Sequence, residues 1–120
     1  MEIPTEDQVL LREVHDMKDN WDGEGAPAAT QQSLAVATGI LYWIYGVADG
    51  KMTLTSLTPG YDGGVDMTWE GQHGTDLYIV IPADGMRIRY VLSVQGTGSK
   101  WGDRAGVLGW SMDDLVKKMI

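Results

Sequence analysis

DGGVDMTWEGQHGTDLYIVIPADGMRIRY, which spans residues 62–90, is the stretch that decides the fold of this chain. It contains three runs in which apolar and polar residues alternate, and turn residues separate these runs, which cover residues 65–69, 77–81 and 86–90. Alternation with a period of two residues predicts strands that bury one face, and the short turns predict an antiparallel meander. The four-residue loop over residues 82–85 then predicts that Ile81 lies opposite Met86.

Two helices are predicted before this meander. Thr5 and Gln8 have the spacing of a capping box, so we expect the first helix to begin at Thr5 and to end near Asn20, before a glycine-rich segment. The second helix is expected to begin at Thr30, whose hydroxyl can cap it, and to run to about Val47. This helix is apolar on nearly all sides, so we expect it either to be central to the core or to bury part of its surface against a second copy or another protein.

The remaining segments complete one predicted domain of the α+β class over residues 1–120. A short strand is expected over residues 52–57, and Ser111 is placed to cap a short C-terminal helix. Residues 91–110 form a glycine-rich extension that carries Trp101 and Trp110, and we expect a loop over most of it. The predicted architecture is therefore two N-terminal helices packed on one face of an antiparallel meander of three or four strands, followed by a short C-terminal helix.

The chain is acidic, and its charge is unevenly distributed. The formal net charge is −8, and residues 1–25 contain eight acidic residues and two basic ones. Because no basic stripe is present, direct binding to nucleic acid is not expected. The sequence has no cysteine, no secretory leader pattern and no apolar run long enough to span a bilayer. We therefore expect a cytoplasmic protein without a membrane partner.

No catalytic, metal or cofactor motif stands out in the sequence. His15 and His73 lie in unrelated segments without the spacing of a zinc site, so no metal site is predicted. Residues 96–100 lack the four-residue gap and the Gly-Lys-Ser/Thr ending of a phosphate-binding loop. We therefore expect a protein that is not an enzyme and needs no cofactor.

Two separated motifs carry a resemblance to other proteins. They are Asn20-Trp-Asp-Gly-Glu-Gly-Ala-Pro27, before the second helix, and Asp62-Gly-Gly-Val-Asp-Met-Thr-Trp69, at the start of the meander. With the strands that follow, they resemble a group of small, largely uncharacterised bacterial and phage proteins that have a Trp-Asp-Gly-x-Gly-Ala segment and an Asp-Gly-Gly hairpin ending in Trp. The resemblance covers roughly residues 18–90 and implies a bacterial or phage origin and an accessory role. It carries over no catalytic residue.

The first of these motifs also has a structural interpretation. Gly23 and Gly25 permit a tight reversal of the chain, and Pro27 stiffens the entry to the second helix. We therefore expect this segment to be a corner of the fold rather than a ligand site.

The favoured hypothesis is a non-enzymatic protein-interaction module that binds and neutralises a protein partner, as an antitoxin, an immunity protein or an anti-defence inhibitor does. The expected partner-binding residues are two tryptophans of the extension and four acids of the first helix: Trp101, Trp110, Glu6, Glu13, Asp16 and Asp19. Three alternatives stay open. They are an acidic nucleic-acid mimic that uses the same four acids to inhibit a DNA- or RNA-binding protein, a homodimeric structural protein that associates through the second helix, and an enzyme of unknown class.

Overall fold

One antiparallel sheet and three helices make up the described part of the chain. The computed structural model describes residues 4–95, 98–105 and 113–120, with the backbone alone at residues 100, 101, 103–105 and 113–115. The elements follow in the order α1 (Thr5–Asp16), α2 (Gln31–Ala48), β1 (Thr53–Pro59), β2 (Val65–Glu70), β3 (Thr75–Ile81), β4 (Arg87–Val94), β5 (Gly98–Ala105) and α3 (Asp113–Met119). The strand order is β1-β2-β3-β4-β5, so each strand pairs with its neighbours in sequence. The predicted α+β class and antiparallel meander are confirmed.

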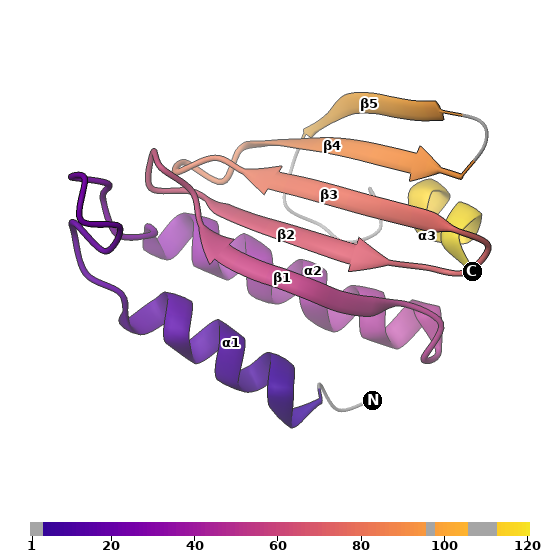
Figure 1. The fold of residues 1–120 in the computed structure, drawn as a ribbon, viewed down its shortest axis with the longest axis horizontal. Helices are drawn as coiled ribbons and strands as arrows, with labels where there is room; N and C mark the ends of the chain where they lie inside the picture. Colours follow the sequence, from indigo (N-terminus) through magenta and orange to yellow (C-terminus); the bar gives the residue numbers. More distant parts are fainter. Residues whose placement is uncertain (1–3, 96–97, 106–112) are drawn as a thin grey trace.

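The layout of the helices differs from the prediction. Figure 1 shows α2 and α3 behind the sheet, whereas α1 lies beyond β1 at the edge of the sheet. α1 buries only Asp7 and Val14, a stripe wide enough to pack along an edge strand but too narrow to cover a sheet face. The two N-terminal helices therefore do not both pack on one face of the sheet, in contrast to the prediction, and the opposite face of the sheet carries none of the described helices.

α1 begins at Thr5 as predicted, but its capping interaction and its C-terminal end differ from the prediction. Its N-cap is Pro4, without a side-chain hydrogen bond, so the predicted capping box of Thr5 and Gln8 is wrong. Instead, the carbonyl of Pro4 accepts the backbone N–H groups of Asp7 and Gln8. The helix ends at Asp16, because Met17 has an extended backbone with φ −67° and ψ 139°.

α2 forms as predicted and supplies much of the core. The Thr30 hydroxyl accepts the backbone N–H of Ser33 at 3.1 Å, and Asp49 ends the helix in the left-handed region. Ile40, Leu41 and Ile44 are fully buried against the sheet. Most of the apolar surface of α2 is therefore used by the core of this chain.

The β3–β4 hairpin is shifted by two residues from the predicted register. Ile79 pairs with Tyr90 and Leu77 with Leu92, so Ile81 does not lie opposite Met86. Met86 belongs to the loop, where its N–H donates to the Asp84 carboxylate at 2.9 Å. A shift by an even number of residues keeps the apolar side chains on the covered face, which is why the predicted alternation still describes the core.

The fifth strand occupies most of the segment that the sequence predicts as a loop. β5 pairs with β4 along its whole length, and Gly102 is paired with Tyr90. A Cβ atom on Gly102 would lie 2.8 Å from the Tyr90 hydroxyl, so this glycine makes room for the tyrosine ring. Ser111, the predicted cap of the C-terminal helix, lies outside the described residues, but Val116 and Met119 dock α3 into the core as expected.

Asp7 gives a first testable prediction, because it is a buried acid at the edge of the core. Its side chain is only 6% exposed, and its Oδ2 atom has no hydrogen-bond partner among the described residues. Burial, followed by the charge of Glu6, raises the pKa of Asp7. The stability that its proton contributes is complete below the ordinary aspartate pKa and is lost as the pH rises through the folded-state pKa.

We therefore expect Asp7→Asn to gain stability relative to the wild type, by about 1 kcal/mol, between pH 3 and pH 7. Urea unfolding at several pH values measures the difference, and Asp16→Asn, at an exposed site of the same helix, is the control. A difference between Asp7→Asn and the wild type that stays constant with pH would contradict the prediction.

Candidate functional site

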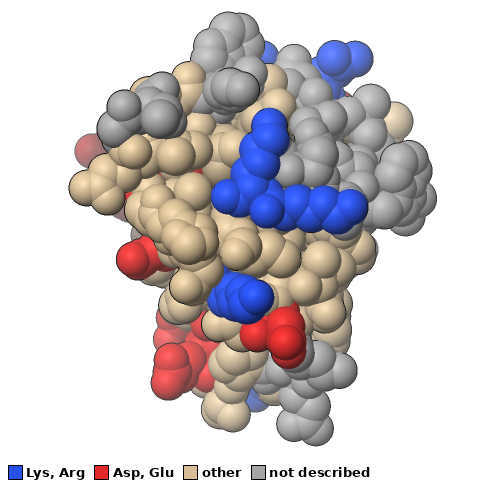
Figure 2. All heavy atoms as spheres, turned by 90° about the vertical axis from the view of Figure 1, so that its right-hand side faces the viewer, with Lys and Arg blue, Asp and Glu red and all other residues tan. Residues whose placement is uncertain are grey.

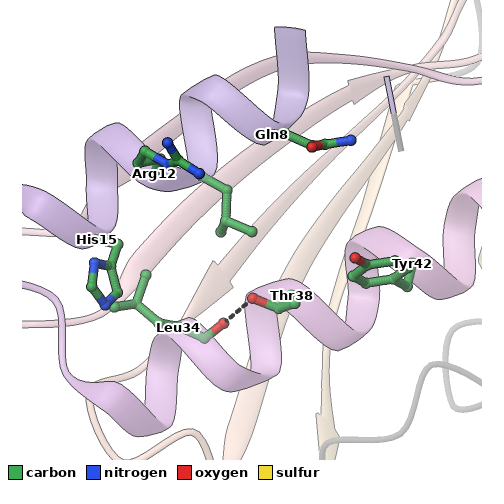
Figure 3. Close-up of a pocket in the computed structure, with 7 residues that line it drawn as sticks. Gln8, Arg12, His15, Leu34, Thr38 and Tyr42 are labelled. Atoms are coloured by element: carbon green, nitrogen blue, oxygen red, sulfur yellow. Dashed lines mark hydrogen bonds between the residues drawn. The ribbon is translucent and has the colours of Figure 1, made fainter. Parts of the chain in front are cut away.

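An open groove of about 390 Å³ lies between α1 and α2 (Figure 3). The residues that line it recur every three or four positions on each helix, so each helix presents one face to the groove. They are Gln8, Leu11, Arg12 and His15 from α1, and Leu34, Thr38 and Tyr42 from α2. The groove stays open because α1 packs along β1 instead of closing onto α2.

Apolar side chains are left accessible in this groove. Leu11 and Leu34 are half-buried and line the groove, and Tyr42 is 57% exposed. Gly39 and Gly46 continue the exposed face of α2 beside Tyr42, and a Cβ atom on either would meet nothing within 4 Å. The packing of the described residues therefore does not require these glycines, although each costs a helix up to about 1 kcal/mol relative to alanine.

The polar groups of the groove come mainly from α1. His15 lies with its Nδ1 atom 3.1 Å from the carboxylate of Asp16, and both side chains are exposed. Arg12 forms no ion pair with a described residue. On α2, the Thr38 hydroxyl donates to the Leu34 carbonyl at 2.8 Å, so that donor is already used. The groove thus combines an apolar floor with a guanidinium and an imidazole on one wall, a combination suited to binding a peptide segment.

The acids predicted to bind a partner are only partly brought together. Glu6, Glu13 and Asp16 are exposed on α1. Glu13 and Asp16 help to line a second hollow, of about 320 Å³, on the outer side of this helix. Asp19 lies beyond the end of the helix, and its carboxylate accepts the backbone N–H of Ala28 at 2.8 Å. Asp19 therefore holds the corner between the helices.

The two tryptophans predicted to bind a partner are described only in part. The backbone of Trp101 lies in β5 and pairs with Val91, and its side chain lies outside the described part of the structure. Trp110 lies outside the described residues altogether. Their part in binding stays a prediction.

The Asn20–Pro27 motif has the corner geometry that its glycines predict. The Asp22 carboxylate accepts the backbone N–H groups of Glu24 and Ala26, at 2.8 and 3.1 Å. These two hydrogen bonds lower the pKa of Asp22, and the bond from the Glu24 N–H has the larger effect. Gly23 and Gly25 have φ values of 76° and 88°, which favour glycine. The Asn20 and Asp22 side chains thus hold the backbone of the motif itself.

The described residues contain neither a cluster suited to a metal ion nor a helix suited to spanning a membrane. No group of three or more histidines and acids is placed to hold a metal ion among the residues whose side chains are described. In the same part of the chain, no helix has the length and apolar character needed to cross a bilayer.

Comparison of the chain with protein-family models, curated proteins and solved structures found no match. The function is therefore argued from the geometry of the groove and its surroundings.

Proposed function

We propose that this chain is a non-enzymatic protein-interaction module that binds and neutralises a protein partner, and that the partner docks in the groove between α1 and α2. The observation that carries the proposal is the apolar floor of this groove, which is left open beside Tyr42, a side chain that is 57% exposed. Tyrosine is one of the residue types that dominate the binding energy of protein interfaces, and a half-buried leucine on each side of the groove adds apolar contact surface.

The shape of the groove favours a helical segment as its occupant. A groove between two helices accepts an amphipathic helix whose apolar stripe inserts between them, with anchors three or four residues apart. Leu11 and Leu34 would contact that stripe, and Tyr42 would pack over one end of it. The small residues next to Tyr42, Gly39 and Gly46, would let the backbone of the partner approach closely.

The charge of α1 favours a partner that is basic around its apolar stripe. Glu13 and Asp16 are exposed on the outer side of the helix, and the whole chain carries a formal net charge of −8. The negative electrostatic potential of these charges speeds the encounter with a basic surface and disfavours acidic partners. Arg12 lies between the groove and the outer hollow, where it could pair with a single carboxylate of the partner.

One of the alternatives also draws support from a specific observation. The exposure of Glu6, Glu13 and Asp16 along α1 favours a nucleic-acid mimic, because the three carboxylates extend over about 15 Å of helix. Asp19 does not extend this row, since its carboxylate is bound to the Ala28 N–H. A mimic would depend almost entirely on charge, whereas docking in the groove depends on apolar contacts.

The experiment that tests the proposal is a pull-down from cells of the source, or of its host, at stepwise increasing salt, with light scattering of the chain alone. We expect a stoichiometric protein partner whose own activity falls when the chain is added. If the amount of partner retained changes by less than about tenfold between 0.1 and 0.5 M salt, the result supports docking in the groove. A steeper loss supports the nucleic-acid mimic. The absence of a partner together with a stable dimer would contradict both and indicate self-association.

A further inference from the structure

We infer that the end of the molecule formed by the α1–α2 and β1–β2 loops is a docking surface for an arginine-bearing segment of a protein partner. The feature that carries this inference is an aromatic pair contributed by these two loops, the half-buried Trp21 and the exposed Tyr61. The surface is separate from the α1–α2 groove, and the inference does not depend on the function proposed for that groove.

The aromatic pair leaves one ring face open to solvent. The ring centroids of Trp21 and Tyr61 are 6.0 Å apart, and the ring planes are inclined by 23°. The indole N–H of Trp21 donates to the Pro27 carbonyl at 3.0 Å, which fixes the orientation of the ring. Tyr61 is 77% exposed, more than any other large apolar or aromatic side chain whose exposure the structure describes. One face of its ring lies on Trp21, and the other face is therefore free for a ligand.

The loops that carry the pair are held in place without a ligand. The Thr30 N–H donates to the Gly63 carbonyl at 2.9 Å, which joins the start of α2 to the β1–β2 loop. Gly64 approaches β3 so closely that a Cβ atom on it would lie 2.0 Å from the Ile81 carbonyl oxygen. Because this hydrogen bond and this close packing already order both loops, binding at the aromatic pair would lose little conformational entropy.

The charge of the two loops selects a cationic ligand. Residues 17–30 and 60–64 contain four acids and one basic residue, which are Asp19, Asp22, Glu24, Asp62 and Lys18. Asp62 also lines a hollow with Asp84, Arg87 and Arg89, and acids still outnumber basic residues at this end when the start of β4 is included. The opposite end of the molecule, where α2 and α3 end, carries the exposed lysines Lys51, Lys117 and Lys118 together with the exposed acids Asp49, Glu70 and Asp76, and Figure 2 shows both basic and acidic atoms on it. The two ends thus differ in charge, and a cation is attracted to the loop end.

A guanidinium group fits this surface better than an ammonium group does. It is planar, so it can lie flat on the open face of Tyr61, where the ring quadrupole attracts it. Its N–H groups lie in its own plane, parallel to the ring, and stay available to donate to an exposed carboxylate of the same loops, such as that of Glu24. Cation–π attraction and charge-assisted hydrogen bonds can therefore act on the same group.

The probe for this surface is a short capped peptide, Gly-Arg-Gly-Arg-Gly, compared with the same peptide carrying citrulline in place of arginine. Citrulline keeps the shape of arginine and most of its hydrogen-bond donors but has no charge. Titration is followed by NMR at the indole N–H of Trp21, which Trp21→Phe assigns. We expect the arginine peptide to shift this signal and the citrulline peptide to bind at least about tenfold more weakly.

Variants of Tyr61 separate ring stacking from general charge attraction. Tyr61→Leu should weaken arginine-peptide binding by about twofold to fivefold, and Tyr61→Phe, which keeps the ring, should retain it. Tyr42→Leu, at the other exposed tyrosine beside the groove, should bind the peptide as the wild type does. Equal binding of the two peptides, or unchanged binding by Tyr61→Leu, would overturn the inference, because either result would mean that the ring does not recognise the guanidinium.

Discussion

Trp69→Ala should lower the free energy of unfolding by about 3–5 kcal/mol, the largest loss that we expect from a single substitution in this chain. Trp69 lies in β2 with no exposed surface, paired with Leu54 on one side and Leu77 on the other. Its ring packs edge-on against Tyr45 of α2, with centroids 5.3 Å apart. Alanine would leave a cavity between the sheet and the helix that covers it, and the surrounding side chains could close it only in part.

Trp69→Phe is the matched control for this loss. Phenylalanine keeps an aromatic ring against Tyr45 and removes the indole N–H, which has no hydrogen-bond partner among the described residues. Its cost should therefore be clearly smaller, at about 1–2 kcal/mol. Urea unfolding followed by far-ultraviolet circular dichroism measures both variants. A loss below about 1 kcal/mol for Trp69→Ala would show that α2 does not pack on the sheet as described.

Tyr42→Ala should weaken binding of the neutralised partner by about thirtyfold, which corresponds to about 2 kcal/mol. The reason is that Tyr42 is exposed by 57% in the free chain and would become buried when a partner helix fills the groove. Because its side chain contributes little to the core, the melting temperature of the variant should change by less than about 2 °C. Calorimetric titration of the purified partner measures the affinity.

The control for Tyr42 is Tyr78→Ala, at another exposed tyrosine. Tyr78 is 39% exposed on the sheet face that carries none of the described helices, where its hydroxyl donates to Asp66 at 3.1 Å. This variant should bind the partner as the wild type does. Equal losses from the two variants would mean that the groove is not the specific contact.

The parts of the fold that local sequence decides were predictable. The cap of α2 follows from a threonine hydroxyl and a backbone N–H three residues away, and it forms at Thr30 as expected. The alternation in β2 and β3 likewise follows from the need to bury one face of each strand. Both features depend on neighbours in the chain, so the sequence contains the whole signal.

Features that depend on distant contacts were not predictable in the same way. Gly102 lies in a glycine-rich segment whose composition is typical of a loop. Only its position against the Tyr90 ring explains why a glycine is found in this strand. The register of the β3–β4 hairpin depends on whether Met86 pairs or stays in the loop, and loop length alone does not decide this. The early end of α1 at Asp16 belongs to the same class, because the corner after it is held by Asp19 and Asp22.

The groove between α1 and α2 could not be predicted from the sequence for a related reason. The groove exists because α1 packs along the edge strand and leaves a gap to α2, and the distance between two helices is not encoded in the pattern of either one. A weak signal was present, since Leu11 and Leu34 lie beside the buried stripes of their helices. Glu6, Glu13 and Asp16 are exposed on α1, and their part in binding a partner stays a prediction.

Site-specific photo-crosslinking tests the docking of a partner in the α1–α2 groove most directly. A photo-reactive phenylalanine is placed at Tyr42 in one variant and at Tyr78 in another, and each is irradiated in the source cell extract. We predict that the Tyr42 variant becomes linked to the protein whose activity the chain inhibits, and that the Tyr78 variant does not. Linkage of that protein at Tyr78 and not at Tyr42 would contradict the account and place the partner on the sheet face opposite α2.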